Sequence, residues 1–124
     1  EDYMVQQTRI GNHKFTRAQI TKTTAAEEVV VSWTVTNTKT GYLAAVELSA
    51  VAHLNETLVL FNVQVDGVSI LTKRHRGNVD RSFSFLLPVP HKLAGDGIKT
   101  IRVVVEQATV NDSVYNASLM GWEE

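Results

Sequence analysis

Apolar and polar residues alternate with a period of two along most of this chain of 124 residues. Successive side chains of a strand point to opposite faces of a sheet, so this pattern predicts strands that are buried on one face. Between 29 and 35 the expected buried set is Val29, Val31, Trp33 and Val35. Between 42 and 54 it begins with Tyr42, Ala44, Val46 and Leu48. No long stretch has a helical period, and we therefore expect an all-β protein.

Turn-forming residues divide the chain into seven or eight short strands. Asp66 and Gly67 both tolerate positive φ and predict a two-residue hairpin. Pro88 and Pro90 cannot donate to a strand ladder and are expected to end the strand that begins near Ser82. Strands at this spacing predict an antiparallel β-sandwich, whose alternation and turns suit a jelly-roll and an immunoglobulin-like strand order equally. We expect residues 25–124 to form this domain and residues 1–24 an N-terminal arm or edge strands.

Some apolar residues fall on strand faces that are otherwise polar. A monomer rarely exposes a large apolar patch, so one explanation is a contact between subunits. The alternative is that loops of the same chain cover both faces of a central strand. On the first explanation the candidate interface residues are Leu58, Leu60, Leu71 and Leu86.

The composition and the motifs argue against most kinds of chemistry. Lysine and arginine number 12 against 13 acidic residues, so no overall field attracts nucleic acid or a membrane surface. No apolar run approaches the roughly 20 residues that span a bilayer. The chain has no cysteine, its four histidines lack metal-site spacing, and it has no nucleophile elbow or phosphate-binding glycine loop. We expect a non-enzymatic protein with no cofactor, metal, nucleic-acid or membrane partner, and only an unrecognised carboxylate pair would make it a hydrolase.

A basic cluster, Lys73, Arg74, His75 and Arg76, stands between two predicted strands. The pattern places it in a loop of about seven residues. A solvated loop is the simpler interpretation, because charge runs are usually solvated. The alternative is a contact with an anionic partner, such as capsid carboxylates or a phosphorylated surface glycan. Among the aromatic residues, Trp122 is the one left open as a sugar-stacking candidate.

From residue 41 onward the sequence resembles the β-sandwich proteins of tailed-bacteriophage virions. The stretches that carry the resemblance are GYLAAVELSAVAHL, FNVQVDGVSI, RSFSFLLPVP, AGDGIKTIRVVVE and VYNASLMGWEE. Such proteins are similar to the TNF/C1q-like jelly roll, are often trimeric, and occur in head decorations, head fibres and tail or receptor-binding fibres. The resemblance therefore favours a jelly roll over an immunoglobulin-like sandwich.

The resemblance also implies a function, that of a structural protein at the surface of a virion. The implied partners are further copies of the chain in a homotrimer and other virion proteins such as the major capsid protein, with a host-surface glycan as a further candidate. The weakly patterned N-terminal segment would be the anchoring arm. The alternative is a carbohydrate- or receptor-binding module that acts through its loops.

Overall fold

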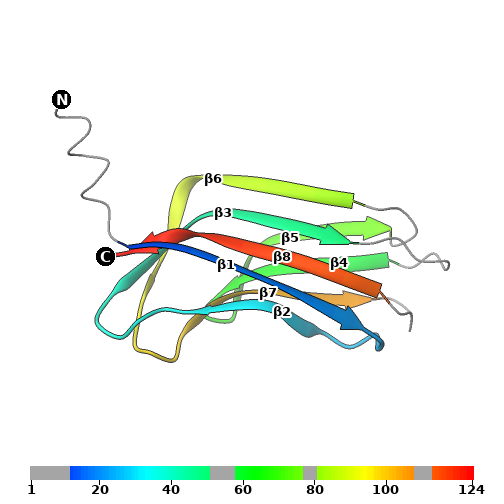
Figure 1. Cartoon of the computed structure of the whole chain (residues 1–124), viewed down its shortest axis with the longest axis horizontal. Helices are drawn as coiled ribbons and strands as arrows, with labels where there is room; N and C mark the ends of the chain where they lie inside the picture. The colour runs from blue at the N-terminus through cyan, green and yellow to red at the C-terminus, as the bar shows by residue number, and fades with distance from the viewer. Residues whose placement is uncertain (1–11, 51–57, 77–80, 108–112) are drawn as a thin grey trace.

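A computed structural model of the chain describes residues 12–50, 58–76, 81–107 and 113–124. Within these ranges the chain forms eight strands and no helix, so none of the described residues belongs to a helix that could cross a membrane. The strands make two antiparallel sheets of four strands each, stacked as two layers (Figure 1). They are β1 (Asn12–Lys22), β2 (Glu28–Thr34), β3 (Thr40–Ala50), β4 (Leu58–Val65), β5 (Val68–Arg76), β6 (Arg81–Ala94), β7 (Thr100–Gln107) and β8 (Ser113–Glu123).

The strand order is that of a jelly roll. One sheet has the order β1-β8-β3-β6 and the other the order β2-β7-β4-β5. All consecutive strands except the β4–β5 hairpin therefore lie in opposite sheets, whereas an immunoglobulin-like order keeps several consecutive strands side by side. The prediction of an all-β sandwich with a jelly roll favoured is confirmed. The edge strand β1 pairs with β8 along its whole length, and residues 1–11 lie outside the described ranges.

The core lies between the two sheets and is rich in valine. Phe61 of β4 is fully buried, and its ring meets the ring of Tyr115 of β8 edge to face, with centroids 5.6 Å apart. This pair joins the centre of one sheet to the other. Trp33 is buried, as the alternation predicts.

A bulge in β2 changes the predicted buried set. The register against β7 shifts between Val29 and Val31, so Val30 and Val31 are both buried. Val29, predicted to be buried, is 41% exposed. A bulge adds one residue to one strand, which moves the residues before it to the other face.

A second bulge, in β3, turns Tyr42 outward. The register shifts between Leu43 and Ala45, and Leu43 is fully buried. Tyr42, expected in the buried set with Val46, therefore lies on the outer face, where its ring stacks on that of Trp122. The alternation alone gives no sign of this change of face.

The strand β6 continues through Pro88 and Pro90, contrary to the prediction that it ends there. β6 is an edge strand, and its pairing with β3 jumps from Leu86 to His91. The two prolines lie in the unpaired segment between those residues, so the ladder loses no hydrogen bond to them. Proline and an irregular edge also hinder pairing with a foreign strand.

The predicted hairpin between β4 and β5 is confirmed. Asp66 has a φ of 51° and Gly67 a φ of 78°. Positive φ at both central residues is the requirement of the type I′ turn, whose twist matches that of the flanking strands.

Candidate interaction surfaces

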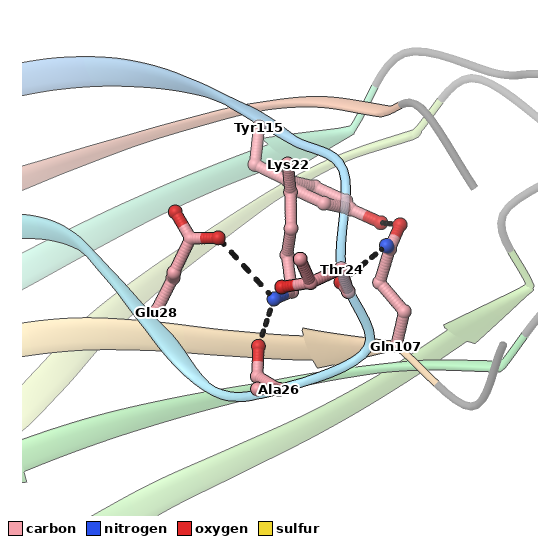
Figure 2. Close-up of polar contacts among 6 residues, drawn as sticks. All are labelled: Lys22, Thr24, Ala26, Glu28, Gln107 and Tyr115. Atoms are coloured by element: carbon pink, nitrogen blue, oxygen red, sulfur yellow. Dashed lines mark hydrogen bonds and ion pairs between the residues drawn. The ribbon is translucent and has the colours of Figure 1, made fainter. Parts of the chain in front are cut away.

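A buried polar cluster closes the turn between β1 and β2 (Figure 2). The fully buried Lys22 donates a hydrogen bond to the carbonyl of Ala26, and its Nζ lies 3.6 Å from the carboxylate of Glu28. Gln107 donates to a carbonyl of the turn at 2.9 Å and accepts from the Tyr115 hydroxyl at 2.8 Å. Burial raises the pKa of Tyr115, so its hydroxyl keeps the donated proton. Since a buried charge needs such partners, we assign this cluster a structural role.

A buried carboxylate, that of Glu123 in β8, lies at the other end of the same sheet. One oxygen, Oε2, accepts from the indole N–H of Trp33 at 2.9 Å and from the backbone N–H of Thr36 at 3.1 Å. Burial acts to raise the pKa of Glu123, but these hydrogen bonds and the charge of Lys14 outweigh it and lower the pKa. Glu123 therefore ties the β2–β3 connection to the C-terminal strand. Among the residues that the structure describes, no group of three or more His, Cys, Asp or Glu side chains could hold a metal ion.

The outer face of the β1-β8-β3-β6 sheet, which we call face A, carries its side chains in rows. Residues paired across neighbouring strands point to the same face, so the register defines each row. One row is apolar and consists of Phe15, Met120, Ala45 and Leu86. Phe15 is 62% exposed and Leu86 is 80% exposed.

Polar and aromatic rows flank the apolar row of face A. The next row on one side consists of Arg17, Ser118, Glu47 and Ser84, and a hollow of about 220 Å³ lies over it. The row on the other side consists of His13, Trp122, Tyr42 and Lys92, and the rings of Tyr42 and Trp122 stack in it with centroids 5.1 Å apart and planes within 11°. Face A thus joins an exposed apolar strip to an aromatic pair and a charged row.

The outer face of the other sheet, which we call face B, is mostly polar. Asn62 accepts hydrogen bonds from Thr72 at 2.6 Å and from Ser69 at 3.1 Å. At one end of this face Leu60 pairs with Arg74 of β5 and with Glu106 of β7. These three residues line a hollow of about 240 Å³ together with Leu58 and Gln107.

The basic cluster lies on strand β5, so the prediction of a loop is wrong. β5 stays paired with β4 as far as Arg76, and strand geometry separates neighbouring side chains. Arg74 is exposed on face B, whereas Lys73 and His75 turn toward β6. There the Nζ of Lys73 lies 4.6 Å from the ring centroid of Phe83, and the His75 ring meets Phe83 edge to face at 5.7 Å. Half of the cluster therefore closes the sandwich between β5 and β6.

The four candidate interface leucines do not form one patch. Leu58 and Leu60 lie on face B and Leu86 lies on face A. Leu71 pairs with the buried Val63 and packs against the core. The sequence did not single out Phe15, because its membership of an exposed row depends on the pairing of β1 with β8.

Comparison with known proteins supports the fold. No family model matches the sequence, and a search of curated proteins finds no match. A chain of the cyanophage Pam1 capsid asymmetric unit is similar in structure, with a TM-score of 0.55 and 16% identity over 92% of this chain and 86% of that chain. A chain from Bacillus endospore appendages, which form disulfide-linked pili, has a TM-score of 0.50 and 10% identity over 89% and 85% of the two chains. At these identities the likeness shows a shared sandwich fold.

Proposed function

We propose that this chain is a non-enzymatic structural protein of a virion, a capsid decoration or fibre module that assembles as a homo-oligomer. The observation that carries the proposal is the eight-stranded jelly roll, which is similar over 92% of its length to a chain of a phage capsid. The bacteriophage resemblance of residues 41–124 supports the same role. The buried side chains Lys22 and Glu123 hold turns and the buried His75 packs on Phe83, so we propose that the outer faces of the sandwich make the contacts with other proteins.

The proposed mechanism is mechanical. A rigid sandwich presents face A and face B, and contacts with capsid proteins or other copies cover their apolar side chains. We propose a homotrimer at the particle surface, with the segment that precedes β1, residues 1–11, as the anchoring arm, because residues 12–22 form β1 of the sandwich. A fibre built from this chain would hold together without disulfides, unlike the endospore pili, because the chain has no cysteine.

The virion role is tested by purifying particles from cells that express the chain from its native genome. We expect mass spectrometry of particles purified on a density gradient to find the chain at a fixed ratio to the major capsid protein. Absence of the chain from intact particles would contradict the role. A variant that lacks residues 1–11 keeps all of β1 and should fail to attach, and unchanged attachment would remove the anchoring arm from the proposal.

A carbohydrate-binding module is the second candidate, favoured by the stacked pair of Tyr42 and Trp122 on face A. Aromatic rings that reach solvent offer apolar surface on which a sugar ring can stack. Binding to a glycan array that is lost in Trp122→Ala would support this function. If an anionic glycan binds the basic cluster instead, its binding should be lost in Arg74→Ala, because Arg74 is the exposed member among residues 73–75.

A further inference from the structure

We infer that face A binds face A of a second copy of this chain, about a two-fold axis that runs along the strands between β8 and β3. The inference concerns the free protein and stands whether or not the chain belongs to a virion. It rests on the order of the side chains within three rows of this face. Those rows are fixed by the register of β1, β8, β3 and β6.

The two-fold rotation reverses the order of the apolar row in the second copy, and the reversed row fits against the original one. Rotation about the proposed axis lays β1 of one copy over β6 of the other, and β8 over β3. Phe15 then covers Leu86, the two exposed ends of the row, and the long side chain of Met120 lies over the small Ala45. Two sheets that pack face to face keep nearly parallel strands, as this axis requires.

The charged row supports a second copy rather than an unrelated apolar partner. Arg17 and Glu47 are both exposed, and within the described part of the chain neither forms an ion pair. They lie two strands apart, a separation of about 10 Å. After the rotation Arg17 of one copy stands over Ser84 of the other, about 5 Å sideways from Glu47 and within reach of a long side chain. The two Glu47 side chains lie at the same sideways distance from each other, and each has an Arg17 of the other copy on its far side. Because the axis is two-fold, the pair of Arg17 and Glu47 forms a second time with the two copies exchanged.

In the third row the rotation lays Trp122 of one copy over Tyr42 of the other, so each intramolecular stack gains a second aromatic neighbour. At the ends of the row it lays His13 of one copy over Lys92 of the other. Four strands about 4.8 Å apart and three rows about 7 Å apart give a face of roughly 400 Å² per copy. A specific interface buries about 800 Å² per partner, so we expect a weak complex with a Kd in the micromolar range.

The test uses charge reversal and sedimentation velocity of the intact chain. Arg17→Glu and Glu47→Arg each place like charges across the contact, and we expect each variant alone to associate at least tenfold more weakly than the wild type. An equimolar mixture of the two variants restores both opposite-charge pairs and should form a complex with one copy of each. Charge reversals at Glu27 and Lys39, exposed residues that directly precede β2 and β3 and belong to none of the three rows, serve as matched controls and should leave association unchanged.

Four results would overturn the inference. They are a wild-type monomer at every concentration up to about a hundred times the expected Kd, a wild-type complex with an odd number of copies, single variants that associate like the wild type, and a mixture that fails to restore association. A dimer supports the contact, as does a hexamer, which would combine it with the three-fold contact of the proposed trimer. Thermal unfolding of each variant shows that lost association does not come from lost folding. Failure of this test leaves the virion role open, because that role is decided by the particle experiment.

Discussion

Replacement of Glu123 by alanine should lower the free energy of unfolding by about 3 kcal/mol. Glu123 Oε2 accepts from the buried indole of Trp33 and from the N–H of Thr36. A hydrogen bond to a charged group contributes about 1.5–3 kcal/mol, and a buried donor that loses its partner also carries a desolvation cost. Water can reach the exposed Thr36, so the indole accounts for most of the loss. Glu123→Gln keeps an oxygen acceptor and should cost about 1 kcal/mol.

Urea unfolding followed by circular dichroism measures both losses. The lowered pKa of Glu123 means that its charge stabilises the fold above the ordinary glutamate pKa of about 4.3. This contribution is lost as the pH falls through the lower pKa of the folded state. The difference in the free energy of unfolding between wild type and Glu123→Gln should therefore have its full value at pH 7 and should shrink below about pH 4. The reasoning would be refuted by an alanine variant within 0.5 kcal/mol of wild type, or by a wild-type to glutamine difference that stays constant from pH 7 to pH 3.

Three further predictions concern the core, the hairpin and the exposed leucine. Phe61→Ala should lose about 3–5 kcal/mol in urea unfolding, because the ring is fully buried against Tyr115; a loss under 1 kcal/mol would contradict this packing. Gly67→Ala should lose about 1 kcal/mol, because a Cβ there meets no atom within 4 Å and only the positive φ is unfavourable; an unchanged stability would argue against the type I′ turn. Leu86→Ser should change the free energy of unfolding by less than about 0.5 kcal/mol yet weaken association, because Leu86 is exposed on face A. Leu71→Ser should destabilise the monomer, because Leu71 packs against the core. A larger loss of stability in Leu86→Ser than in Leu71→Ser would contradict the placement of these leucines.

The alternation predicted the fold class and most of the core, because both depend on local sequence. Trp33 is buried and the Asp66–Gly67 hairpin has the expected backbone geometry. The misplaced residues Val29 and Tyr42 both lie beside a bulge. A bulge is fixed by how two strands pair, which one strand's pattern does not contain.

The candidate surfaces were harder to predict, because a surface joins residues that are distant in the sequence. The residues of the basic cluster are consecutive in the sequence, yet the strand points Lys73 and Arg74 to opposite faces of the sheet. Phe15 and Leu86 are separated by seventy residues and share a row only through β8 and β3. Strand order and register are tertiary information, and they decided which apolar residues stand together.

The native mass of the wild-type protein across a dilution series tests most directly the claim that this molecule works through contacts between its copies. Sedimentation velocity from about 1 to 300 μM covers the affinity expected for a face of this size. We predict a dimer of the 13.7 kDa chain, or a hexamer that combines the face A contact with the three-fold contact of the proposed trimer, and we expect either to dissociate on dilution. A monomer at every concentration, or a trimer that never forms a hexamer, would mean that face A does not bind itself.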